Sequence, residues 1–332
     1  MNVAVVGSGA WGTALAIRLH KNGHRVCLWT FEKDLIPQME QERTNPRLPG
    51  AVLPEGLEIS ADYACVAGCK IVVIATPSFP IRMNCRGVAP YLDEDAVLVC
   101  VTKGLEEGTQ LRMSQVVAQE TGREVVVLTG PSHAEEVALD KPTGCLAACE
   151  NQALAELVQD VFMAEHFRIY TSPDAVGAEL GAALKNVIAL CAGVTDGLGC
   201  GDNTKAMLMT RGLTEIARLG VALGAKKETF AGLAGVGDLI VTCTSMHSRN
   251  RRAGILIGQG VEPQEAMRQV GAVVEGYYAA KSAWELCRKM DVDMPILQAA
   301  YNVLYQGASA AEAVQVLLKR DKRAESEDAG WL

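Results

Sequence analysis

The chain has 332 residues, enough for two domains that each bury a hydrophobic core. Its 39 acidic residues outnumber 31 lysines and arginines, and the formal charge of −8 argues against nucleic acid or an anionic membrane as its main partner. The 11 cysteines show no CxxC pair and no zinc-ligand spacing. With no secretory leader and no apolar run near the ~20 residues that span a bilayer, we expect a reduced, cytoplasmic protein without a metal or a membrane-inserted segment.

The chain opens on an apolar run that ends in three glycines. Residues 3–6 are expected to form a buried parallel strand, and Gly7, Gly9 and Gly12 then lead into a helix at residues 13–22. Gly7 would permit the tight turn, Gly9 would let a pyrophosphate approach the backbone, and Gly12 would let the helix press against the sheet. The alternative is a glycine-rich turn of another α/β fold. The pattern favours a dinucleotide site at the N-terminus of this helix.

Further apolar runs alternate with helical or turn-rich sequence. Their continuous apolarity predicts strands buried on both faces, and hence a doubly wound, mostly parallel sheet with its ligand crevice beyond the carboxyl ends of the strands. We expect these strands at residues 25–29, 71–75, 96–101, 124–129, 143–149 and 167–170. The sheet domain would therefore end near residue 172.

Helical patterns replace strand patterns after that point. Ser172 is expected to cap a helix with Pro173 in its first turn. Further helices are predicted at residues 204–223, 263–270, 276–290, 295–304 and 310–319. The predicted organisation is a dinucleotide-binding domain at 1–172, a helical substrate domain at 173–320 and a solvated tail at 321–332.

One lysine interrupts an otherwise apolar helix. Lys185 and Asn186 lie within the run from 182 to 190, so Lys185 either extends to water or has a buried role. Burial would lower the pKa of the lysine toward a value useful in acid–base chemistry. An exposed lysine on an amphipathic helix is the alternative.

Other candidates stand out by charge or by position at strand ends. Ser248, Arg249 and Asn250 begin the densest positive run of an acidic chain and suit a phosphate dianion, although a solvated helix start fits the same residues. Asp238 could orient a catalytic ammonium or simply cap a helix. Lys103 follows a predicted strand and could reach the crevice or lie on the surface.

Together these segments resemble the bacterial NAD(P)-dependent sn-glycerol-3-phosphate dehydrogenases. The resemblance runs from residue 2 to about 318 and is carried by six ordered motifs: Gly7-Ser8-Gly9-Ala10-Trp11-Gly12, Thr102-Lys103-Gly104-Leu105-Glu106, Gly130-Pro131-Ser132-His133-Ala134, Leu184-Lys185-Asn186, Gly235-Val236-Gly237-Asp238-Leu239 and Ser248-Arg249-Asn250. It implies a Rossmann domain for the cofactor, a helical domain for the substrate, and interconversion of dihydroxyacetone phosphate and sn-glycerol 3-phosphate for phospholipid synthesis.

The resemblance also implies residue roles. Lys185 would be the general acid and base, Lys103 a second positive group at the reacting oxygen, and Asp238 the residue that orders them. Substrate contacts carry over to Lys103, Gly130, Ser132, Lys185, Asp238, Ser248, Arg249 and Asn250. Cofactor contacts carry over to Gly7, Gly9, Ala10, Trp11, Gly12, Phe31, Lys103, Ala134, Arg249, Val273 and Glu275.

Two positions depart from the pattern of the family. Ala10 stands where many relatives have serine, which removes a hydroxyl contact to the pyrophosphate, and Phe31 stands where a polar residue often lies near the adenosine ribose. Glu32 and Lys33 lie side by side just beyond the second strand, so an acid that favours NAD adjoins a cation that favours NADP. We expect both cofactors to be used, with a slight preference for NADPH, by a homodimer.

Two other functions fit parts of the sequence. One is a related two-domain dehydrogenase that acts on a hydroxy acid or a sugar acid. The other is a redox sensor that binds the cofactor but has lost catalysis. The presence of Lys185 and of the run from Ser248 to Asn250 argues against this alternative.

Overall fold

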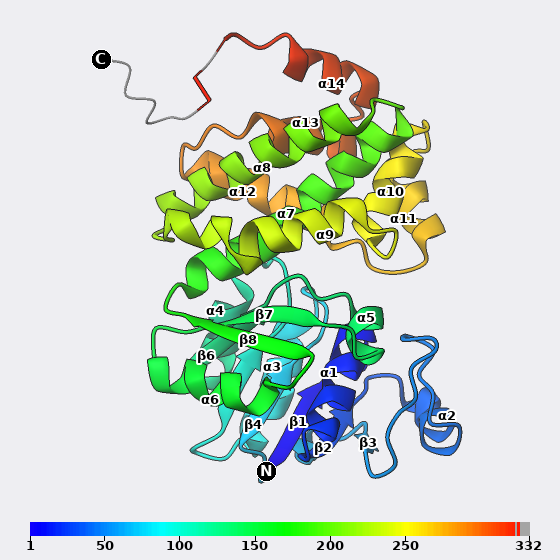
Figure 1. Cartoon of the computed structure of the whole chain (residues 1–332), viewed down its shortest axis with the longest axis vertical. Helices are drawn as coiled ribbons and strands as arrows, with labels where there is room; N and C mark the ends of the chain where they lie inside the picture. The colour runs from blue at the N-terminus through cyan, green and yellow to red at the C-terminus, as the bar shows by residue number, and fades with distance from the viewer. Residues whose placement is uncertain (323, 326–332) are drawn as a thin grey trace.

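An eight-stranded sheet forms the N-terminal half of the protein, and helices alone form the C-terminal half, as the computed structural model shows for residues 1–322, 324 and 325 (Figure 1). The strand order is β3-β2-β1-β4-β5-β6-β7-β8. The strands are β1 (Asn2–Val6), β2 (Arg25–Trp29), β3 (Glu58–Ser60), β4 (Ile71–Ile74), β5 (Val97–Cys100), β6 (Val125–Thr129), β7 (Thr143–Ala148) and β8 (Phe167–Ser172). All neighbours pair in parallel except β6 and β7.

Helices cover both faces of this sheet because alternate strand residues enter two different cores. Val3 and Val5 face one core with α1 (Ala10–Lys21) and α6 (Gln152–Phe162), whereas Ala4 and Val6 face the other with α3 (Ile81–Val88) and α4 (Met113–Thr121). The helices of this half are α1 (Ala10–Lys21), α2 (Ile36–Gln41), α3 (Ile81–Val88), α4 (Met113–Thr121), α5 (Ala134–Ala138) and α6 (Gln152–Phe162). The strand order reverses between β1 and β4, and a Rossmann-type sheet binds its ligand at such a point.

The predicted strands are confirmed, and the doubly wound sheet with them. The sequence patterns missed β3, a three-residue edge strand whose one apolar residue, Ile59, gives no periodic signal. The prediction that Ser172 caps the next helix was wrong. Ser172 pairs with Ala148 at the end of β8, and the Asp174 side chain accepts the capping hydrogen bond from the Gly177 N–H at 2.8 Å.

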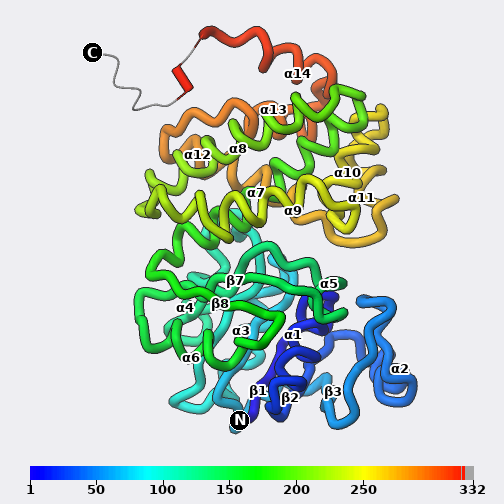
Figure 2. Tube along the Cα trace, in the orientation of Figure 1, coloured from blue at the N-terminus to red at the C-terminus, as the bar shows by residue number. Residues whose placement is uncertain are grey.

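The helical half surrounds one long central helix, α7 (Figure 2, green). Its helices are α7 (Ala175–Gly197), α8 (Asp202–Ala222), α9 (Asp238–Thr244), α10 (Arg249–Gly258), α11 (Pro263–Val270), α12 (Glu275–Lys289), α13 (Pro295–Tyr305) and α14 (Ala310–Leu318). The change from strands to helices between 172 and 175 falls at the predicted domain boundary. The division into separate domains stays a prediction, and most of the predicted tail at 321–332 lies outside the described residues.

The central helix corrects one expectation. α7 has 23 residues, and an 18-residue window within it has a mean hydropathy of 1.4, so the helix is long and apolar enough to cross a membrane, although no such run was expected. The sequence hid this length because Glu179, Lys185 and Asn186 interrupt the apolar residues. In the structure 83% of the apolar window is buried by protein, so α7 is a core helix.

Glycines on α7 and α10 let the two helices touch. A methyl group at Gly193 would lie 2.1 Å from the Arg251 carbonyl oxygen, and one at Gly254 would lie 2.0 Å from that of Leu190. Gly197 and Gly258 repeat the contact one turn further on. This close packing holds the first turn of α10 beside the middle of α7, where Lys185 lies.

Candidate functional site

The turn between β1 and α1, called here the glycine turn (residues 7–12), is shaped by contacts within the protein and by one open position. Gly7 has φ +125°, and a methyl group on it would lie 2.6 Å from the Ala75 carbonyl oxygen. A methyl group on Gly12 would lie 1.9 Å from the Gly7 carbonyl oxygen, whereas one on Gly9 would meet nothing within 4 Å. Gly9 therefore faces free space at the N-terminus of α1, which has no side-chain cap. This open backbone fits a dinucleotide pyrophosphate.

A polar network that the sequence patterns missed holds this turn. The Asn45 amide donates to the Ser8 carbonyl oxygen at 2.9 Å and to the Thr13 hydroxyl at 2.8 Å. The Ser8 hydroxyl donates to Thr30 Oγ1 at 2.6 Å, which ties the turn to the end of β2. Asn45 lies 37 residues from Ser8, so no local pattern reveals the contact.

Two lysines from different halves of the chain meet on one buried carboxylate. Lys185 is 5% exposed and Asp238 1% exposed, and the Lys185 ammonium donates to Asp238 Oδ1 and, at 2.6 Å, to the Thr242 hydroxyl. Lys103 donates to Asp238 Oδ2 at 2.8 Å and to the Gly130 carbonyl oxygen at 3.3 Å. These four side chains, Lys103, Lys185, Asp238 and Thr242, are called the lysine–aspartate cluster below.

The electrostatics of this cluster suit proton transfer. Burial lowers the pKa of Lys185 most, Asp238 raises it, and the nearby Lys103 ammonium lowers it, so that the pKa is about 7. Because two lysines share a single carboxylate, the cluster can carry a net positive charge where water is excluded. A buried positive charge of this kind stabilises negative charge on a reacting oxygen.

Local structure explains how Asp238 and Thr242 come to face Lys185. A π-helical turn, Leu233–Gly237, runs directly into α9, and such turns recur at functional sites. Asp238 and Thr242 are four residues apart on α9 and so share one face. Thr242 donates to the Asp238 carbonyl oxygen at 2.6 Å, which leaves its lone pairs for Lys185. The sequence reading missed Thr242, although its spacing from Asp238 was available.

The predicted phosphate residues start α10. Ser248 caps the helix by accepting from the Arg251 N–H at 3.2 Å. Arg249 is exposed and makes no hydrogen bond or ion pair with any residue that the structure describes, whereas Arg251 is paired with Asp196 at 2.8 Å. The first turn of α10 therefore combines the Arg249 guanidinium, unpaired among the described residues, with the N-terminus of a ten-residue helix.

Asn250 links α10 to both neighbouring helices. Its side-chain NH₂ donates to Asn186 Oδ1 at 2.9 Å, and its side-chain oxygen Oδ1 accepts from the Gly276 N–H at 2.8 Å. A methyl group on Gly276 would lie 2.4 Å from the Asn186 carbonyl oxygen, so α12 begins in contact with α7. Asn186 therefore helps to hold α7, α10 and α12 together through its hydrogen bond with Asn250.

The other predicted contact residues line up along the boundary between the halves. Gly130 has φ +152°, and its carbonyl oxygen accepts from the Ser132 hydroxyl at 3.1 Å as well as from Lys103. Glu275 accepts from the Ser78 hydroxyl at 2.8 Å, and burial raises the pKa of Glu275. Ser78 follows β4 and was marked in the sequence as a polar residue at a strand end, but no role was assigned to it.

The remaining predicted cofactor residues lie on several elements. Ala10 and Trp11 begin α1, Ala134 begins α5, Val273 precedes α12, and Phe31 is 74% exposed beyond β2. Their contacts with a cofactor stay predictions.

An ion pair lies beyond the end of β2. Arg47 donates through Nε to Glu32 at 3.1 Å and through a second nitrogen to the other carboxylate oxygen, and the pair lowers the pKa of Glu32. A cavity of about 580 Å³ opens nearby, lined by Lys33, Ile36, Ile59, Ser60, Ala61, Asp62 and Tyr63. Arg47 is therefore a third charged residue, beside Glu32 and Lys33, to consider in the choice between NAD and NADP.

The Rossmann-type sheet, the glycine turn and the buried lysine of a helical second half define a class of protein, the two-part nicotinamide-dependent dehydrogenases. Comparison with known proteins identifies the family. Residues 2–155 match the N-terminal region, and residues 174–315 the C-terminal region, of NAD-dependent glycerol-3-phosphate dehydrogenase. The chain belongs to the NAD(P)-dependent glycerol-3-phosphate dehydrogenase family, as its motifs predicted.

Individual relatives agree over almost the whole length. The chain is 51% identical to "Glycerol-3-phosphate dehydrogenase [NAD(P)+]" of Geobacillus kaustophilus, covering 98% of this chain and 97% of that protein. A crystal structure of glycerol-3-phosphate dehydrogenase from Coxiella burnetii superposes with a TM-score of 0.92 at 38% identity, covering 96% of this chain and 99% of that one.

A hydroxy-acid enzyme shares only the fold. D-mandelate dehydrogenase with NADH superposes with a TM-score of 0.62 at 13% identity, over 95% of this chain and 100% of that one. Family membership therefore sets aside the alternative of a hydroxy-acid or sugar-acid dehydrogenase.

Proposed function

We propose that this dehydrogenase interconverts dihydroxyacetone phosphate and sn-glycerol 3-phosphate, with Lys185 as the group that gives and takes the proton. The observation that carries this proposal is the lysine–aspartate cluster, in which Lys185 is buried and held by Asp238 beside Lys103. The chain's relatives named glycerol-3-phosphate dehydrogenase support the choice of substrate.

Reduction of the ketone needs a hydride at the central carbon and a proton at its oxygen. A bound nicotinamide supplies the hydride. The Lys185 ammonium has three N–H donors, and Asp238 and Thr242 accept two of them, which leaves one for the substrate oxygen. Lys185 gives up that proton as the oxygen becomes a hydroxyl, and in the reverse direction the neutral amine removes it. Because the pKa of Lys185 is about 7, both forms are available near neutral pH.

Lys103 and Asp238 have supporting roles in this scheme. Lys103 adds a second positive charge for the developing alkoxide, and Asp238 holds both ammonium groups in place. Gly130 and Ser132, next to Lys103, contact the body of the substrate.

The substrate phosphate would bind at the start of α10. Arg249 offers a free guanidinium, and the helix N-terminus favours an anion. Ser248 and Asn250 complete this subsite, Asn250 through the amide hydrogen that Asn186 leaves free.

The cofactor would lie across the glycine turn. Gly7, Gly9, Ala10 and Gly12 would hold the pyrophosphate through the backbone. Further contacts are proposed for Trp11, Phe31, Lys103, Ala134, Arg249, Val273 and Glu275. Both cofactors would be used, with a slight preference for NADPH, because Arg47 neutralises Glu32 and Lys33 would offer a cation to a 2′-phosphate bound beyond β2.

The assembly and location follow the family resemblance alone. The enzyme is a homodimer of the cytoplasm, supplying sn-glycerol 3-phosphate for phospholipid synthesis. Light scattering of the purified protein checks the dimer, and a monomer mass would contradict it.

A turnover assay tests the reaction. The absorbance of reduced nicotinamide is followed with dihydroxyacetone phosphate, and with a 2-oxo acid of similar size as the matched control. Steady oxidation with the phosphorylated ketone and none with the acid is expected. Cofactor binding without turnover would instead support the redox-sensor alternative.

A further inference from the structure

A short hairpin directly after Lys103 lies between the two halves of the protein. Leu105 pairs with Arg112 in an antiparallel bridge, and the Glu106 N–H donates to the Leu111 carbonyl oxygen at 2.9 Å. Gly108, with φ +84°, lies in its turn. This segment is called the hairpin 105–112 below.

The apolar residues of the hairpin enter opposite cores. Leu105 is 5% exposed and belongs to the core of the helical half, although it lies in the N-terminal half of the chain. Leu111 packs against the core that α3 and α4 form with the sheet. The hairpin is therefore held by both halves at once.

Its polar residues divide in the same way. Glu106 pairs with Arg82 of α3 at 2.7 Å, and the next residue, Glu107, pairs with Lys281 of α12 at 2.6 Å. Further along, Gln110 donates to Glu285 of α12 at 2.8 Å. The neighbouring carboxylates Glu106 and Glu107 thus pair with helices of different halves, α3 and α12.

The far end of the hairpin is tied to the helix that carries Lys185. Arg112 pairs with the buried Glu179 of α7, and Ser114 donates to the same carboxylate through its N–H at 2.8 Å. Glu179 lies six residues before Lys185 on α7. The hairpin therefore connects Lys103 at one end to the helix of Lys185 at the other.

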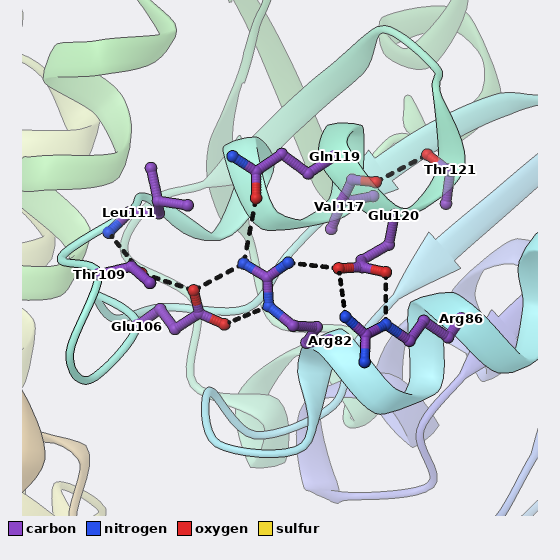
Figure 3. Close-up of polar contacts among 9 residues, drawn as sticks. All are labelled: Arg82, Arg86, Glu106, Thr109, Leu111, Val117, Gln119, Glu120 and Thr121. Atoms are coloured by element: carbon purple, nitrogen blue, oxygen red, sulfur yellow. Dashed lines mark hydrogen bonds and ion pairs between the residues drawn. The ribbon is translucent and has the colours of Figure 1, made fainter.

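Arg82 of α3 pairs with Glu106 of the hairpin (Figure 3). Two guanidinium nitrogens of Arg82 donate to the two oxygens of Glu106, each at 2.7 Å, and Thr109 adds a third donor at 2.5 Å. Such a paired geometry fixes orientation as well as charge. Arg82 also reaches Glu120 of α4, which Arg86 holds from the other side.

We propose that the hairpin 105–112 holds Lys103 against Asp238, and that Arg82, acting through Glu106, is a positioning residue for the lysine–aspartate cluster. Lys103 precedes the anchored Leu105 by two residues, so a shift of the hairpin moves the backbone from which Lys103 extends. Displacements near 1 Å can lower turnover by about a hundredfold. This inference rests on the catalytic role proposed for Lys103.

Replacing Arg82 tests the inference, with Arg86 as the matched control. Arg82→Ala removes the pair with Glu106, and kcat with dihydroxyacetone phosphate should fall by about tenfold. Arg86→Ala removes an arginine of the same helix that pairs with Glu120 and not with Glu106, and its kcat should stay within about twofold. The NADPH dissociation constant and the melting temperature are measured for both variants, and the Arg82 variant should keep its cofactor affinity.

A double-mutant cycle separates positioning from a general structural effect. If Arg82 acts through Lys103, the loss from Arg82→Ala should shrink to within about twofold in a Lys103→Ala background. Glu106→Gln, which keeps the shape of the side chain, should reproduce the loss of Arg82→Ala and serves if that variant folds poorly.

Three outcomes overturn the inference. The first is an unchanged kcat in both Arg82→Ala and Glu106→Gln. The second is that Arg82→Ala lowers kcat by the same factor in the Lys103→Ala background as in the parent. If Lys103→Ala alone leaves kcat within about twofold, the proposed role of Lys103 fails, and the inference fails with it.

Discussion

The glycine turn and the lysine–aspartate cluster are built from different kinds of groups. In the turn, backbone packs directly on backbone: a methyl group added to Gly12 would lie 1.9 Å from the Gly7 carbonyl oxygen, so only glycine fits there. The cluster is a set of buried charges, in which Asp238 serves Lys185 and Lys103 together. The turn should therefore be sensitive to added volume, and the cluster to lost charge.

The largest expected effect comes from removing the buried charge. Lys185→Met keeps the volume of the side chain and removes the proton donor, so kcat should fall by about 10³-fold. The affinity for NADPH, measured by fluorescence titration, should change little because the glycine turn is untouched. Turnover within a few-fold of the parent would show that another group moves the proton.

Added volume should act on the turn in two distinguishable ways. Gly12→Ala places a methyl group against the Gly7 carbonyl oxygen, so the protein should lose about 1–3 kcal/mol of unfolding free energy. Gly9→Ala meets no protein atom and should leave the melting temperature unchanged, while cofactor affinity falls by about tenfold or more because the methyl group would lie where the pyrophosphate fits. Equal effects of the two variants on stability would contradict this account of the turn.

The pH dependence of the reaction should follow Lys185. The reduction needs the protonated ammonium, so its rate should decline as pH rises through about 7, while the oxidation should accelerate over the same range. The charged and titratable groups that face Lys185 are Asp238, Lys103, His133 and Cys243.

Two variants should shift the pKa of Lys185, and with it the pH midpoint of the reaction, in opposite directions. Asp238→Asn removes the anion that raises the pKa of Lys185, and so should move the midpoint to lower pH. Lys103→Ala removes a cation that lowers this pKa and should move the midpoint to higher pH. Midpoints that stay the same in both variants would assign the titration to another group.

The smallest expected effect concerns the choice of cofactor. Arg47→Ala leaves Glu32 unpaired beyond the end of β2, where we propose that the 2′ position of the adenosine binds, and should therefore raise the KM for NADPH by about fivefold and leave that for NADH nearly unchanged. Arg43→Ala is a control nearby, since Arg43 donates to backbone carbonyl oxygens at Leu53 and Leu57 and not to Glu32. A parallel change in both KM values would remove Arg47 from the selection.

The sequence predicted the backbone of the site better than its side-chain contacts. Continuous apolar runs revealed the buried strands, and glycine spacing revealed the turn, because both depend on neighbours in the chain. The pair between Lys185 and Asp238 joins residues 53 positions apart, and the motifs of the family brought them together as candidates. Thr242 and Asn45 belong to no such motif, and packing alone places them, whereas Ser78 was marked only by its position after a predicted strand.

The helix boundaries teach the same lesson. Ser172, Pro173 and Asp174 form a good local start signal for a helix, yet pairing of β8 with β7 keeps Ser172 in the sheet and moves the cap to Asp174. Tertiary pairing thus overrode the local preference of the serine.

The most direct test of the central claim is chemical rescue of Lys185→Ala by small primary amines. If Lys185 transfers the proton, methylamine should restore turnover in a saturable, pH-dependent manner, and Asp238→Ala in the same background should weaken that rescue. Failure of every amine to raise the rate, in a variant that still binds NADPH and dihydroxyacetone phosphate, would contradict the account.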